Sequence, residues 1–226
     1  MKAMILAAGR GERMRPLTDT IPKPLLSVAN KPLIVYHLEK IAAMEITEVV
    51  INIAYLGDKI RQALGDGSRW GLTIQYSEET EPLETAGALL HALPLLGDTP
   101  FLLVNGDVWT DLNFSSVVDV PLNDALARLV FVKNPEHNLQ GDFYINENNL
   151  VEQSTSRLSN TFGGVALISP KIISGYPNKR RIFPLKEVFD YYIEQQLLEG
   201  IVYSGKWCDV GTPARLASLG AFLLTA

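Results

Sequence analysis

The stretch Lys-Ala-Met-Ile-Leu-Ala-Ala at residues 2–8 runs directly into Gly-Arg-Gly-Glu-Arg-Met-Arg-Pro-Leu-Thr at residues 9–18. The apolar run is typical of a strand buried on both faces, as strands of parallel sheets are. Glycines directly after such a strand let backbone N–H groups approach an anion closely. The start of the chain therefore predicts the first strand of an α/β sheet, with an anion-binding loop at its carboxyl end.

Strands and helices alternate along the rest of the chain. We expect strands at 48–53, 72–76, 101–105, 127–132 and 162–168, helices at 32–44, 59–64, 85–93, 185–198 and 212–224, a hairpin at 142–151, and short strands at 201–203 and 207–210. Thr212 is suited to cap the last helix, with Pro213 at its first position. This alternation predicts a Rossmann-like three-layer α/β/α fold around a mostly parallel mixed sheet.

Composition excludes several classes of protein. The 226 residues are 47% hydrophobic and 20% charged, which is ordinary for a globular enzyme, and we expect one domain over 1–226. A net charge of -5 argues against a general nucleic-acid binder. The single cysteine, Cys208, excludes an intrachain disulfide and fits the cytoplasm. No 18-residue apolar run favours a membrane span.

The glycine loop fits neither of two common phosphate-binding motifs. A dinucleotide fingerprint needs a small residue where Met14 stands, and a P-loop needs a Gly-Lys-Ser/Thr sequence that is missing here. On the glycines alone, a tight turn with solvated arginines and a phosphate-binding loop both stay open. The Pro22-Lys23-Pro24 segment predicts a stiff, extended stretch, and rigidity favours a lysine that contacts phosphate.

The loop and the Pro-Lys-Pro-Leu segment together resemble the signature of the sugar-1-phosphate nucleotidylyltransferases. The resemblance continues through Asn30–Ile34 and covers nearly the whole chain. It implies a GT-A-like nucleotidyltransferase fold, with a nucleotide half at 1–110 and a sugar-phosphate half at 111–226. It also implies that the triphosphate binds the loop at Ala8, Gly9, Gly11, Glu12 and Arg13, and that Lys23 contacts phosphate.

The segment Glu-Glu-Thr-Glu-Pro-Leu-Glu-Thr-Ala-Gly at residues 78–87 resembles the part of the family that grips the nucleobase through backbone groups. Glu79, Thr85 and Gly87 are the expected base-site positions. Glu84 stands where many members have glycine, so its side chain could take a role of its own. An acidic loop before a helix is the alternative.

Two aspartates are candidate metal ligands. Asp107 follows the apolar run 101–105, at the carboxyl end of an expected central strand, where ligands bind in open α/β sheets. The Trp-Cys-Asp-Val-Gly-Thr-Pro string at 207–213 resembles the family's closing motif, which makes Asp209 the second ligand. The resemblance implies that both hold Mg²⁺, which favours carboxylate and phosphate oxygens. Asp111 is expected to cap a helix that begins near Asn113.

The acceptor site is expected in the second half. The resemblance implies sugar contacts at Asn105, Gly141, Glu152 and Thr161. Gln153 replaces a lysine of the family, so another cation must neutralise the sugar phosphate. The basic cluster at residues 179–181 is one candidate, and a solvated loop is its alternative. Phe162 replaces an asparagine, which predicts a more apolar pocket wall. We expect no chemistry from the three histidines.

The reaction implied is sugar 1-phosphate plus nucleoside triphosphate giving nucleoside diphosphate sugar plus pyrophosphate. Details at 65–72, 81–87 and 103–111 are most similar to short members that use UTP in cell-wall recycling. A guanylyltransferase for mannose- or heptose-type sugars and a non-catalytic nucleotide-sugar sensor remain alternatives. Because the chain stops after the helix at 212–224, we expect no appended β-helix. We expect a monomer or small homo-oligomer that binds neither nucleic acid nor membranes.

Overall fold

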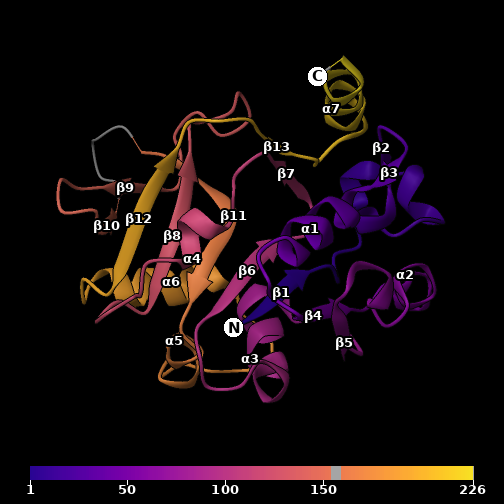
Figure 1. Cartoon of the computed structure of the whole chain (residues 1–226). Coiled ribbons are helices and arrows are strands. Elements are labelled where there is room, and N and C mark those ends of the chain that lie inside the picture. The colour runs from indigo at the N-terminus through magenta and orange to yellow at the C-terminus, as the bar shows by residue number, and fades with distance from the viewer. Residues whose placement is uncertain (154–158, 226) are drawn as a thin grey trace.

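The computed structural model describes residues 1–153 and 159–225. Its centre is a seven-stranded sheet in the order β12-β8-β11-β6-β1-β4-β5 (Figure 1). These strands are β1 (Lys2–Leu6), β4 (Glu48–Ile53), β5 (Thr73–Glu78), β6 (Phe101–Asn105), β8 (Ala127–Val132), β11 (Thr161–Ile168) and β12 (Leu198–Tyr203). β11 runs antiparallel to both of its neighbours, and the other pairings are parallel. The predicted mostly parallel mixed sheet is therefore confirmed.

Helices cover both faces of the sheet because side chains of its strands alternate between two apolar cores. Ala3 and Ile5 of β1 pack with α1 (Leu33–Ala42), α2 (Gly57–Leu64) and α4 (Ser115–Val118). Met4 lies in the other core, with α3 (Glu84–Leu96), α5 (Lys171–Ser174) and α6 (Leu185–Ile193). This alternation is the period-two pattern of a strand buried on both sides. The three-layer architecture is the one predicted (Figure 1).

Three two-stranded ribbons extend the structure beyond the main sheet. They are β2 (Ser27–Val28) with β3 (Lys31–Pro32), β9 (Phe143–Ile145) with β10 (Val151–Gln153), and β7 (Val108–Thr110) with β13 (Trp207–Asp209). The β7–β13 ribbon ties the segment before the last helix, α7 (Pro213–Thr225), to the end of β6. Thr212 Oγ1 accepts the Arg215 N–H at 3.3 Å, as expected of a helix cap.

Two predictions about helix ends are wrong. The helix expected at 185–198 ends at Ile193, because a turn with Gln196 at φ +58° follows and Leu198 already starts β12. Asp111 does not cap the helix near Asn113. Its carboxylate accepts the Lys206 N–H at 2.8 Å and the Tyr203 hydroxyl, while Asn113 Oδ1 takes the Ser115 N–H.

Among the described residues, no helix is both long enough and apolar enough to cross a lipid bilayer.

Buried His37 gives the fold a predicted acid sensitivity. It is 1% exposed on α1, its Nε2 bonds the Val108 carbonyl at 2.8 Å, and burial lowers its pKa to about 4. The unfolded chain takes up this proton near pH 6.5 and the folded chain near pH 4, so the stability from neutral His37 is present above pH 6.5 and lost as pH falls to 4. We expect protonation of His37 alone to lower the free energy of unfolding by about 3 kcal/mol as pH falls from 6.5 to 4.

Urea unfolding of the wild type and of His37→Asn at pH 7.5 and pH 4.5 measures this effect. The variant should be less stable at pH 7.5 but lose markedly less stability on acidification. Equal acid losses in the two proteins would contradict the assignment to His37.

Candidate active site

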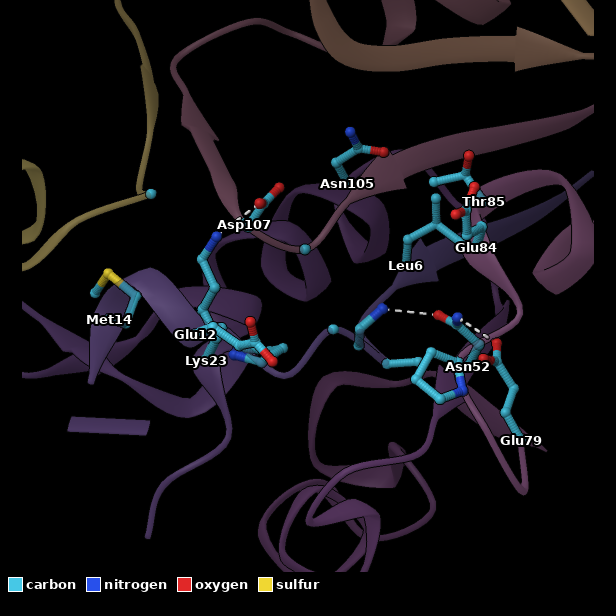
Figure 2. A pocket seen from close by; sticks show the side chains of 18 of the residues that line it. Leu6, Glu12, Met14, Lys23, Asn52, Glu79, Glu84, Thr85, Asn105 and Asp107 are labelled. Carbon is cyan, nitrogen blue, oxygen red and sulfur yellow. Dashed lines mark hydrogen bonds and ion pairs between the residues drawn. The ribbon is translucent and has the colours of Figure 1, made fainter. Parts of the chain in front are cut away.

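A cavity of about 470 Å³ lies at the carboxyl ends of β6, β1, β4 and β5 (Figure 2). These four strands are parallel neighbours, so the segments that follow them meet at one edge of the sheet. Most of the site residues predicted for the nucleotide half line it, namely Ala8, Gly9, Gly11, Glu12, Arg13, Lys23, Glu79, Thr85, Asn105 and Asp107.

The glycine loop after β1 presents unused backbone donors to this cavity. Within the described part of the chain, no protein group accepts a hydrogen bond from the backbone N–H groups of residues 8–13. Gly11 has φ +63°, and a Cβ there would lie 2.9 Å from the Thr18 side chain and 3.2 Å from Lys23 Cβ. Only glycine fits this close approach without strain. The loop therefore has the free amides and compactness of an anion-binding nest.

Lys23 is held against this loop and points toward the end of β6. Its Nζ donates to Asp107 Oδ2 at 2.6 Å, and its side chain is 10% exposed (Figure 2). The expected extended stretch is wrong from Lys23 onward, because Lys23–Leu25 forms one 3₁₀ turn in which the Leu25 N–H bonds the Pro22 carbonyl at 2.8 Å. The rigidity expected of the segment comes from this turn and from burial.

Asn52 is a polar residue of the cavity that sequence reasoning missed. Its Oδ1 accepts the Ala7 N–H at 2.7 Å, and its Nδ2 donates to Glu79 Oε1 at 2.7 Å (Figure 2). Glu79 Oε2 accepts the Leu83 N–H at 3.2 Å, and burial raises the pKa of Glu79. The available signal was the one polar side chain near the end of the apolar run 49–53. This chain of bonds fixes the glycine loop relative to the segment before α3.

The first turn of α3 has an exposed carboxylate, Glu84, and a backbone N–H, that of Gly87, which is bonded to another part of the chain. Glu84 lines the cavity at φ +58°, a left-handed conformation that glycine adopts more easily. Thr85 Oγ1 accepts the Leu185 N–H at 2.7 Å. The Gly87 N–H donates to the Phe183 carbonyl at 3.2 Å, and Gly87 lies beside a separate cavity near Arg181. The structure therefore brings Glu79 and Thr85 to the main cavity, but not Gly87.

The β7–β13 ribbon brings the two candidate metal aspartates to the same edge of the sheet. Asp209 pairs with Val108, and the Val210 N–H donates to the Asp107 carbonyl at 2.8 Å. Asp209 Oδ2 contacts Arg215 Nη1 at 2.8 Å and His137 Nε2 at 3.2 Å. Asp209 Oδ1 is buried and has no hydrogen-bond partner among the residues described.

These residues fit a magnesium ion that is shared with phosphate. The unpartnered, buried Oδ1 of Asp209 is an available ligand, although Asp209 lines a neighbouring cavity and not the main one. Asp107 presents a second carboxylate in the main cavity. Across residues 1–153 and 159–225, no three His, Cys, Asp or Glu side chains gather into a closed cage. Mg²⁺ commonly takes one or two carboxylates and completes its shell with water and phosphate oxygens.

The residues predicted to contact the sugar lie in two places. Asn105 lines the main cavity and packs against Gly164 of β11. Gly141, Glu152 and Thr161 do not line it. Thr161 Oγ1 donates to Asn134 Oδ1 at 2.9 Å, and the Gly141 N–H bonds the Asn138 carbonyl at 3.1 Å beside it.

Glu152 lies on the β9–β10 ribbon, where its Oε1 accepts the Asn146 Nδ2 hydrogen bond at 2.6 Å. Phe162 packs edge-on against Phe131 and Phe189 at the side of the apolar core, and the more apolar pocket wall stays a prediction.

A family model and the curated relatives of this chain agree on the same protein family. Residues 2–151 match the family model described as nucleotidyl transferase. N-acetylmuramate alpha-1-phosphate uridylyltransferase of Neisseria meningitidis is 47% identical, over 96% of this chain and 95% of the relative. Mannose-1-phosphate guanylyltransferase catalytic subunit beta of Drosophila melanogaster is 32% identical, over 94% of this chain and 60% of the relative.

Solved structures share the fold. A putative glucose-1-phosphate thymidylyltransferase from Bacillus anthracis, in complex with sucrose, superposes with a TM-score of 0.87 at 24% identity and covers 98% of this chain and 94% of that one. HddC from Yersinia pseudotuberculosis, complexed with GMP-PN, gives 0.80 at 22% identity over 98% and 99%. At these identities the two structures carry the fold comparison alone.

Proposed function

Because the chain belongs to the nucleotidyl transferase family, we propose that it joins UTP to N-acetylmuramate α-1-phosphate, giving UDP-N-acetylmuramate and pyrophosphate. The observation that carries the choice of substrates is the 47% identity to the uridylyltransferase over nearly the full length of both chains. We place the reaction in peptidoglycan recycling, which that relative's substrate implies.

The cavity supports this chemistry with groups that bind and orient phosphates. We assign the triphosphate to the free amides of residues 8–13 and to Arg13 and Lys23, and the base to the backbone near Glu79 and Thr85. The nucleotide then occupies the half at 1–110. The acceptor lies between Asn105 and the second half, with Gly141, Glu152 and Thr161 as proposed outer contacts.

The transfer itself needs alignment and charge neutralisation. An anionic oxygen of the sugar phosphate attacks the α-phosphorus of UTP, and the bond from that phosphorus to the β-phosphate oxygen breaks as pyrophosphate leaves. The attacking oxygen carries no proton, so no general base is required. Lys23 and the loop amides offset negative charge along the triphosphate, as positioning groups do in phosphoryl transfer. Asp107 and Asp209 would hold Mg²⁺, which supplies further positive charge at the reacting phosphates.

Pyrophosphate release across four nucleoside triphosphates and a panel of sugar 1-phosphates tests the proposal. We expect UTP with N-acetylmuramate 1-phosphate to give the highest kcat/KM, and release to stop when EDTA removes Mg²⁺. Preference for GTP with mannose 1-phosphate would favour the guanylyltransferase alternative, which the 32% identical relative supports. Tight nucleotide binding without release from any pair would favour a sensor.

A further inference from the structure

The phosphate of the acceptor needs a cation. The side chains that the sequence suggests for this role, at positions 153 and 179–181, already form hydrogen bonds or ion pairs with other protein groups. Gln153 replaces the expected lysine, and its Nε2 donates to Asp190 Oδ1 at 2.7 Å. In the basic cluster at 179–181, Lys179 bonds the Ser174 and Tyr176 carbonyls and Arg180 forms two bonds to Glu187. Arg181 bonds Thr80 and Glu81. The three cations therefore stabilise the segment around residues 179–181 through bonds to protein groups.

Arg215 places a guanidinium at the border between two cavities. It lies in the first turn of α7, and its side chain is 22% exposed. A Cβ on Gly211 would come within 2.3 Å of Arg215 Nη2, so the guanidinium rests directly on the Gly211 backbone. Gly211 lines the main cavity together with Lys23 and Asp107. Arg215 itself lines a second cavity of about 340 Å³, beside Asp209 and Trp207.

Much of this guanidinium is free to bind a ligand. Nη1 contacts Asp209 Oδ2 at 2.8 Å and the His137 ring. Within residues 1–153 and 159–225, no protein acceptor pairs with Nε or Nη2. Since Arg215 uses Oδ2 of Asp209, the buried Oδ1 stays available to a metal ion. One arginine can therefore steady the carboxylate and still offer a planar pair of donors to an anion.

We infer that Arg215 binds the phosphate of the acceptor sugar, as the cation that replaces the lysine absent at position 153. This inference rests on the proposed function, because it assumes a sugar 1-phosphate as acceptor. The phosphate, rather than another anionic group of the sugar, is the expected partner because Arg215 is bonded to Asp209. The ribbon places Asp209 beside Asp107, at the end of the acceptor where the new bond forms.

Steady-state kinetics of Arg215→Gln and Arg215→Lys separate this role from a structural one. We expect Arg215→Gln to raise KM for N-acetylmuramate 1-phosphate at least tenfold and to change KM for UTP less than twofold. Arg215→Lys keeps the charge but loses the forked geometry of the guanidinium. Its KM for N-acetylmuramate 1-phosphate should therefore lie between those of the wild type and Arg215→Gln. The matched control is Arg69→Gln, an exposed arginine stacked over Trp70, which should leave both KM values unchanged.

Calorimetry with α,β-methylene-UTP and Mg²⁺ gives a readout that does not depend on turnover. The methylene bridge cannot be cleaved, so N-acetylmuramate 1-phosphate can be titrated into the ternary complex at equilibrium. We expect Arg215→Gln to weaken its binding at least tenfold, while unphosphorylated N-acetylmuramate binds the wild type and the variant alike. Equal weakening of both sugars would assign Arg215 to the lactyl carboxylate and overturn the inference.

Two further outcomes keep this inference distinct from the proposed function. If wild type releases pyrophosphate but Arg215→Gln changes only kcat and the Mg²⁺ requirement, Arg215 merely positions Asp209 and the inference is wrong. If wild type fails with every acceptor, the proposed function fails, whatever Arg215 does. Melting temperatures of all three variants, measured beside wild type, exclude misfolding as the cause of a loss.

Discussion

Replacing Asp107 by asparagine is expected to lower the rate of pyrophosphate release by about 10³-fold or more, equivalent to about 4 kcal/mol. Asp107 lines the cavity, lies in the turn that directly follows the central strand β6, and pairs with Lys23 at 2.6 Å. Asparagine keeps the shape but removes the charge that pairs with Lys23 and that the proposed Mg²⁺ would require. Release should be followed at saturating UTP, sugar phosphate and Mg²⁺.

The fold should survive this substitution. The Asp107 side chain is 42% exposed, and the bond that anchors the β7–β13 ribbon here uses the backbone carbonyl of Asp107, which asparagine retains. The matched control is Asp111→Asn, four positions along the chain, where the amide oxygen can still accept the Lys206 N–H. That control should keep activity within about twofold. Retention of more than a tenth of the wild-type rate by Asp107→Asn would exclude Asp107 as a metal ligand.

Much of the fold could be predicted because local patterns determine it. Strands at 48–53, 101–105 and 127–132 have the bounds expected from their apolar, β-branched runs. The last helix also begins where Thr212 and Pro213 predict. Helix ends that depend on tertiary contacts were harder to predict from the sequence. Apolar Leu197 and Leu198 continue the pattern of α6, yet burial in the sheet makes Leu198 part of β12.

The candidate site was partly predictable for the same reason. Motif residues that follow neighbouring parallel strands converge once the sheet forms, so Lys23 and Asp107 lie together as their shared edge suggests. Pairings between distant segments carry no local signal. The ribbon that positions Asp209, the Asn52–Glu79 bond and the contact of Arg215 with Asp209 all depend on chain separations that periodicity does not report.

Replacing Lys23 by methionine is expected to reduce kcat/KM for UTP by about 10²- to 10³-fold. Methionine fills the apolar part of the slot beside Gly11 but brings no charge to the triphosphate. Lys23→Arg should restore less than a tenth of activity, because a guanidinium is too broad for a side chain that is 10% exposed. Lys31→Met is the control, since Lys31 pairs with Glu39 in a half-exposed surface bridge. Unchanged kcat/KM for UTP in Lys23→Met would contradict a phosphate contact.

Because Lys23 and Asp107 touch, their substitutions should not be additive. Either single change leaves the other group without its charge partner at 2.6 Å, so each loss includes the cost of the stranded charge. The double variant Lys23→Met/Asp107→Asn should therefore lose less activity than the product of the two single losses. A fully multiplicative loss would mean that the pair seen here does not contribute to catalysis. The same cycle measured by urea unfolding separates this coupling in turnover from a coupling in stability alone.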